Sequence, residues 1–186
     1  MNDKSRGGFF IEKNSGQKKY QKILMGLFII YLVMLVWIIL FKFSFSIGEL
    51  EHIRNINFVP FKGAMITNGK INFSEMYMNM FIFAPFGVYL GVLFPNWKGY
   101  GKVFTVFFAS VILEVLQYIL AIGRTDITDV INNTLGGLVG LLVYVLIGKA
   151  AKSEERARGI VFWCALVGTI LMLALIGIVY GKNGVF

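Results

Sequence analysis

Five long runs of apolar residues dominate the chain and are separated by more polar stretches. The runs cover residues 23–41, 75–94, 103–122, 127–147 and 160–180. Each is close to the roughly 20 apolar residues that an α-helix needs to cross a bilayer core. The pattern therefore predicts an all-α, multi-pass membrane protein with five transmembrane helices.

The stretches between the runs divide the chain into segments of different character. Residues 1–22 are polar and basic, and residues 149–159 form a short charged loop. We expect residues 23–148 to form a four-helix membrane core with a long connection at residues 42–74. Residues 160–186 would form a fifth transmembrane helix with a short tail.

The connections and the glycines within the runs also carry information. Pro60 disfavours helix at the residue before it, so residues 54–61 should be extended. Residues 123–126 are interpreted as a short bend between the third and fourth spans. Two glycine pairs, Gly87 with Gly91 and Gly136 with Gly140, have the spacing that permits close helix approach in membranes.

Composition agrees with a membrane protein and excludes several functions. Hydrophobic residues make up 57% of the chain and charged residues only 15%. The net charge of +8 does not indicate nucleic-acid binding, because the basic residues lie between apolar runs rather than in one patch. Cys164 and His52 are the only residues of their types, which excludes an intrachain disulfide and a metal site rich in Cys or His.

The distribution of Lys and Arg predicts the orientation. With five spans, 12 of the 18 basic residues fall on the side of the N-terminus and six on the other side. Because cytoplasmic loops are enriched in Lys and Arg, the N-terminus should be inside and the C-terminus outside. The connections at residues 42–74 and 121–127 would then lie together on the outer face.

Polar side chains inside the spans concentrate near that same face. An ionised group at the centre of a membrane helix costs about 2.5–3.5 kcal/mol on insertion scales, so such groups are either paired or functional. Glu114 and Gln117 lie in the outward half of the third span, and Asp129 and Asn133 in that of the fourth. Together with Asn79 at the start of the second span, they predict a polar cavity in the outer leaflet.

Three stretches of the sequence resemble the VanZ-like family of bacterial membrane proteins. They are RNINFVPF at residues 54–61, NMFIFAPFGVYLG at 79–91 and SVILEVLQYILAIGRTDITDVINNTLGGLVG at 110–140. The resemblance covers about residues 20–148. It implies a cell-membrane protein of the cell envelope, associated with resistance to teicoplanin-type lipoglycopeptide antibiotics.

Two functional hypotheses from different classes follow. In the first, the protein binds or alters an envelope lipid or a lipid-linked precursor at the outer face. In the second, it is a metal-dependent intramembrane enzyme acting on a polyprenyl- or lipid-linked phosphate, so whether it is an enzyme stays open. The candidate substrate-binding residues are Arg54, Asn57, Asn79, Gln117, Arg124 and Asn133.

The enzyme hypothesis assigns more specific roles. Glu114 and Asp129 are the candidate catalytic residues, with Glu114 as acid or base. Asp126 and Asp129 are the candidate metal ligands, because paired carboxylates can hold Mg²⁺ through oxygen atoms. Arg124 and Arg54 would clamp phosphate oxygens. The cofactor is otherwise unknown.

A structural interpretation competes with both hypotheses. Arg124 would pair with a carboxylate, and the amides would satisfy one another between helices. Asp126 would be the N-cap of the fourth span, since Asp is a favoured N-cap residue. A homo-oligomer is also left open, because a dimer would bring the number of spans to ten.

Overall fold

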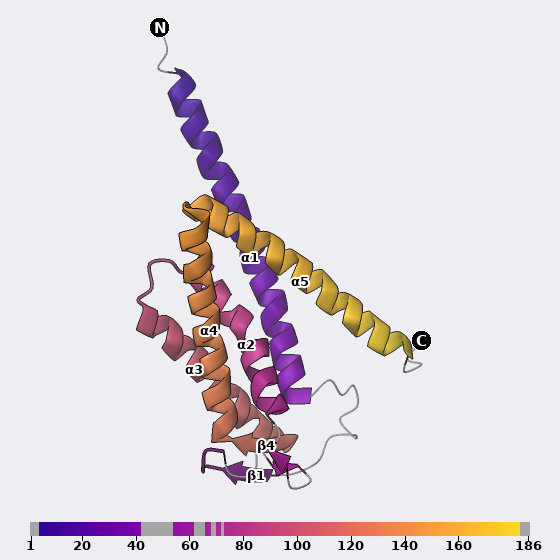
Figure 1. Cartoon of the computed structure of the whole chain (residues 1–186). Coiled ribbons are helices and arrows are strands. Elements are labelled where there is room, and N and C mark those ends of the chain that lie inside the picture. Colours follow the sequence, from indigo (N-terminus) through magenta and orange to yellow (C-terminus); the bar gives the residue numbers. More distant parts are fainter. Residues whose placement is uncertain (1–3, 42–53, 62–65, 68–69, 72, 183–186) are drawn as a thin grey trace.

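The computed structural model describes residues 4–41, 54–61, 66–67, 70–71 and 73–182. Within these ranges there are five α-helices, each long and apolar enough to cross a membrane (Figure 1). The predicted multi-pass, all-α fold with five transmembrane helices is therefore confirmed. The helices are α1 (Lys4–Phe41), α2 (Ser74–Leu93), α3 (Gly99–Leu120), α4 (Ile127–Ala151) and α5 (Glu154–Lys182).

Two of the predicted polar segments are helical instead. The basic N-terminal segment is part of α1 from Lys4 onward, and Figure 1 shows this end of α1 projecting beyond the other helices. The prediction of a charged loop at residues 149–159 is wrong, because only Lys152 and Ser153 form a turn between α4 and α5. Its Ala, Lys, Glu and Arg residues are good helix formers, so they extend the two helices rather than form a loop.

Four short strands accompany the helices. β1 (Arg54–Asn57) pairs in parallel with β4 (Gly123–Asp126), and β2 (Ile66–Thr67) pairs in antiparallel fashion with β3 (Lys70–Ile71). The predicted extended conformation is confirmed for β1. The interpretation of residues 123–126 as a simple bend is wrong, because they form a strand that pairs with a distant part of the chain.

α2 and α4 run in the same direction and touch backbone to backbone. A Cβ atom at Gly140 would overlap the carbonyl oxygen of Ala84, and one at Gly87 would overlap that of Gly137. A Cβ at Gly136 would likewise collide with the backbone of Met80. The close approach predicted from the glycine pairs is confirmed for these positions, and only glycine permits it.

α1 and α3 complete the packed core, whereas α5 lies at its edge. Phe28 of α1 stacks near Phe86 and Tyr89 of α2, with ring centroids 5.6 and 5.1 Å away. In the spans of the first four helices, 28–44% of the residues are buried, but in α5 only 6% are. Figure 1 shows α5 leaning away from the other helices toward its C-terminal end.

Candidate functional site

The predicted polar residues meet at one end of the bundle. α2 and α4 begin there, α3 ends there, and the β1–β4 pair lies across that end (Figure 1). α3 stops because Ala121 adopts a left-handed backbone, with φ of 54°, and its N–H returns to carbonyls of the last turn. The chain then passes through β4 directly into α4. We call the hydrogen-bonded groups at this end the strand-end network.

Asn57 and Asp126 form the centre of the strand-end network. They are partners in the β1–β4 register, and Asn57 Nδ2 donates to Asp126 Oδ2 over 2.9 Å. The other carboxylate oxygen, Oδ1, accepts from the N–H of Thr128 at 2.9 Å. Asp126 is therefore the N-cap of α4, as the structural interpretation predicted.

Glu114 ties the end of α3 to the same place. Its Oε2 accepts from the N–H of Asp126 at 3.0 Å, and its backbone carbonyl accepts from the Thr125 hydroxyl at 3.1 Å. Only 3% of Glu114 is exposed. The carboxylate holds the backbone of Asp126 and the carbonyl holds the side chain of Thr125, so Glu114 fixes the path of β4.

A second pair joins α2 to α4. Asn79 Nδ2 donates to Asp129 Oδ1 over 2.7 Å, across the interface made by the glycines. Both side chains are partly exposed. The predicted neighbourhood of Asn79 and Asp129 is thus present, one helical turn beyond the cap at Asp126.

Two other predicted residues serve neighbouring contacts. Gln117 donates through Nε2 to the carbonyl of Ile39 at 2.8 Å, in the last turn of α1 where helix carbonyls lack intrahelical partners. Asn133 donates to the Ser110 hydroxyl at 2.8 Å. Neither amide bonds to the other or to the Asn57–Asp126 pair, so the expectation that the amides satisfy one another between helices is wrong for the described contacts.

Three buried amide oxygens in this region have no hydrogen-bond partner among the described residues. They belong to Gln117, Asn132 and Asn133. Buried acceptors are normally satisfied, and leaving one without a donor costs about 1–3 kcal/mol. The interior of the α3–α4 interface therefore carries acceptor groups beyond what the fold uses.

The two arginines are placed only in part. Arg54 is the first residue of β1, and Arg124 is the second residue of β4, so both backbones lie at the strand end. In the register Arg124 is opposite Asn55. Their side chains lie outside what the structure describes, and the predicted phosphate clamp stays a prediction.

The predicted metal site depends on the carboxylates of Asp126 and Asp129. Among the described residues, no group of three or more His, Cys, Asp and Glu is close enough to hold a metal ion. Both carboxylate oxygens of Asp126 accept hydrogen bonds from protein donors. Mg²⁺ requires near-octahedral oxygen ligation, which this donor set does not favour. Ligation by Asp126 and Asp129 stays a prediction, and no chemical step is derived from it.

The sequence interpretation missed residues that complete the site. Thr128 accepts from the N–H of Phe61 at 3.0 Å through its hydroxyl, which fixes the turn after β1 onto the first turn of α4. Thr128 and Asn132 are each 2% exposed and stand four residues apart, on one face of α4. Asn132 is one of the polar residues of the fourth span, and the presence of Thr128 one helical turn before it was the signal that could have revealed Thr128.

The turn fixed by Thr128 is apolar and exposed. Phe58, Val59 and Phe61 are exposed by 77, 51 and 44%. Phe61 has a φ of 62°, a left-handed conformation that a bulky residue rarely adopts. The N–H of Val59 donates to Asn57 Oδ1 at 3.2 Å, so the turn begins at the central residue of the network. We call residues 58–61 the apolar turn.

Comparisons with known proteins agree with this architecture. A family model described as VanZ/LLP1 matches residues 28–148, which contain α2, α3, all of α4 except its last three residues, and every residue of the network. Protein VanZ of Enterococcus faecium is 40% identical over 153 residues, or 81% of this chain and 89% of its own length. No solved structure gives a significant match. The chain belongs to the VanZ/LLP1 family of membrane proteins.

Proposed function

We propose that this VanZ-like protein acts in the cell membrane and lowers sensitivity to teicoplanin-type lipoglycopeptides. It would do so by binding an envelope lipid or a lipid-linked precursor at the strand end of the bundle. That end would face outward, as the distribution of basic residues predicts. The first support is membership of the VanZ/LLP1 family.

The observation that carries the proposal is the adjacency of the network and the apolar turn. A lipid-linked ligand is amphiphilic, so it needs hydrogen-bonding groups beside an apolar surface. Asn57 belongs to both elements, because it bonds to Asp126 and to the backbone of Val59. Both elements are held on the first turn of α4, where a polar head group and an acyl chain could be engaged together.

The Asn79–Asp129 pair between α2 and α4 is the expected contact for the polar head group of the ligand. Asn79 and Asp129 stand at the start of their helices, and both can be reached from outside the bundle. Asn57 is also partly exposed. Glu114, in contrast, is almost fully buried and holds β4. Ligand binding should therefore depend most on Asn79, Asp129 and Asn57.

A resistance assay tests this function. The protein is expressed in a teicoplanin-susceptible Gram-positive host, and the inhibitory concentrations of teicoplanin and of a glycopeptide without an acyl chain are compared. Teicoplanin protection is expected, and it should fall in Asp129→Asn and Asn79→Leu. The amount of monodisperse protein in detergent is measured for each variant. If protection falls only in proportion to the amount of folded protein, the polar residues have a structural role and the proposed binding site is wrong.

The same variants separate binding from catalysis. The enzyme hypothesis expects a divalent-ion requirement and complete loss of activity in Glu114→Gln and Asp129→Asn. The binding hypothesis expects partial protection in Glu114→Gln and no effect of chelation. Native mass spectrometry of the purified protein would identify a co-purifying polyprenyl phosphate, another lipid or a metal, and would also count the copies in any homo-oligomer.

A further inference from the structure

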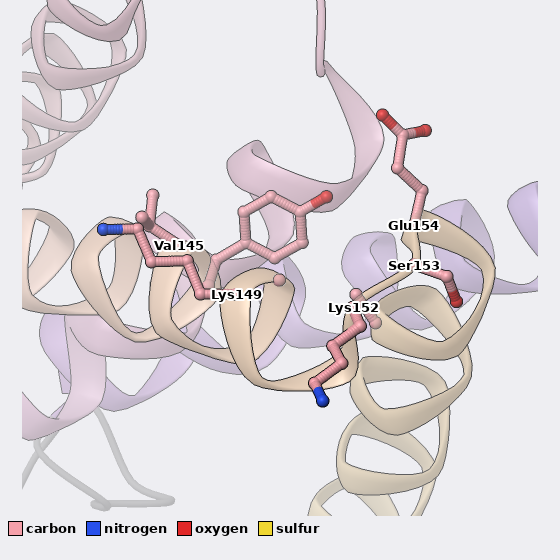
Figure 2. Close-up of a pocket in the computed structure, with 8 residues that line it drawn as sticks. Val145, Lys149, Lys152, Ser153 and Glu154 are labelled. Atoms are coloured by element: carbon pink, nitrogen blue, oxygen red, sulfur yellow. The ribbon is translucent and has the colours of Figure 1, made fainter.

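A hollow of about 590 Å³ lies at the other end of α4 from the strand-end network. Lys149 in its wall and Asp129 in the network are about 30 Å apart along α4, at 1.5 Å per residue. It is an open hollow, lined by residues from the last two turns of α4, the turn after it and the start of α5 (Figure 2). It is therefore separate from the site proposed above.

The walls of the hollow combine positive charge with apolar surface. Lys149, Lys152 and the hydroxyl of Ser153 supply the polar lining, while Tyr144, Val145 and Ala157 supply the apolar lining. Figure 2 shows Lys149 in the last turn of α4 and Lys152 just after it, with the two amines directed to different sides and Glu154 directed away from the Lys152 amine. The Glu154 carboxylate also lies 3.3 Å from Arg158, which partly neutralises it. The hollow therefore favours an anion.

Its position identifies the kind of anion. The hollow sits where α4 ends and α5 begins, and both helices are long and apolar enough to cross a membrane. If both span the bilayer, the hollow would lie at the level where head groups meet acyl chains. Val145 is 48% exposed and continues the hollow onto the apolar flank of α4. Basic pockets at the ends of membrane helices are typical binding sites for anionic lipid head groups. A soluble anion would make no use of the apolar wall.

We propose that this hollow binds the phosphate of an anionic membrane phospholipid. Lys149 and Lys152 are the cationic partners, and their exposed side chains would turn toward the phosphate. Ser153 would donate a hydrogen bond, and an acyl chain would lie along Tyr144 and Val145. Each lysine amine is a compact charge that suits a phosphate without demanding bidentate geometry. The lipid would hold the hinge between α4 and the little-buried α5.

Lipid-resolved native mass spectrometry tests the proposal. The wild-type protein is titrated with phosphatidylglycerol and with phosphatidylcholine of the same acyl composition. One phosphatidylglycerol should bind at least about tenfold more tightly to wild type than to Lys149→Gln/Lys152→Gln, since each lysine near the lipid surface attracts an anionic head group. Phosphatidylcholine should bind weakly to both. The matched control is Lys22→Gln/Lys98→Gln, which removes two exposed charges outside the hollow.

Three outcomes would overturn the proposal. Equal loss in the control pair would show that overall charge, and not the hollow, attracts the lipid. Failure of Lys149→Arg/Lys152→Arg to retain phosphatidylglycerol would show that positive charge at these positions does not hold it. Displacement of the lipid by millimolar inorganic phosphate would assign the hollow to a free anion. Both lysines are exposed, so circular dichroism should show that all variants fold.

Discussion

Asn57 and Asp126 are joined twice, as partners in the β1–β4 register and through a 2.9 Å hydrogen bond between their side chains. They are 69 residues apart in the sequence. The pair therefore closes the long connection before α2 onto the start of α4. Because Asp126 also caps α4, one carboxylate sets the beginning of a membrane helix and the position of the apolar turn.

Replacing Asp126 should separate these two roles. Asp126→Ala removes both the cap and the bond to Asn57, and loss of an N-cap alone costs about 0.5–2 kcal/mol. Asp126→Asn keeps a good cap but presents an amide to Asn57. The amount of folded protein that remains after heating in detergent, measured by size exclusion, should be highest for wild type, lower for Asp126→Asn and lowest for Asp126→Ala. Equal stability of Asp126→Ala and wild type would contradict the capping assignment.

The glycine contacts between α2 and α4 predict a position-specific cost. In Gly140→Ala the new methyl group would overlap the Ala84 carbonyl, and overpacking of this kind costs about 1–3 kcal/mol. Gly168→Ala is the matched control, because nothing lies within 4 Å of a Cβ there. The yield and thermal stability of folded protein should fall for Gly140→Ala and not for Gly168→Ala. Similar values for both would show that the two backbones are not in contact.

Asn132 and Asn133 should respond differently to the same substitution. Asn132→Leu removes a buried oxygen that has no partner among the described residues, so stability should be kept or raised. Asn133→Leu also removes an oxygen without a partner, but it breaks the 2.8 Å bond to the Ser110 hydroxyl, so this variant should be less stable than Asn132→Leu. Interhelical bonds in membranes average about 0.6 kcal/mol, so the difference between the two variants should be small but measurable. Thermal unfolding of both variants in one detergent checks the order.

The apolar turn predicts a loss of function without a loss of stability. Phe58 is 77% exposed, so Phe58→Ser removes little packing and should unfold at the wild-type temperature. Teicoplanin protection should nevertheless fall, because the surface proposed for the acyl chain becomes polar. Tyr100→Ser is the control, since Tyr100 is 63% exposed at the far end of α3. If both variants protect fully, the turn takes no part in the function.

The membrane spans could be predicted because each depends on local composition. Both predicted ends of α2 were within one residue of the observed ends, since the polar residues Ser74 and Glu75 mark the start of its apolar run. The predicted end of α4 and the predicted start of α5 were wrong by several residues, because Lys149 and Glu154 are polar and yet favour helix. Hydropathy detects where lipid begins, whereas helix propensity decides where the helix stops.

The contacts of the network could be predicted only in part. Asp126 and Asp129 identified the start of α4, and helical spacing placed Glu114 nearby. The pairing of β1 with β4 had no local signal, because each strand has four residues and no alternating apolar pattern. Its register depends on the fold of the whole bundle, which brings Arg54 beside Gly123.

The contact of α2 with α4 also sets how the molecule can deform. The backbones of α2 and α4 touch without side chains between them, so rotamer changes cannot let one helix slide along the other. The two helices should therefore move as one rigid unit. We therefore expect a response to a ligand at the strand end to leave the angle between α2 and α4 unchanged. The paired strands and the turn after Asn57 would move relative to the two helices instead.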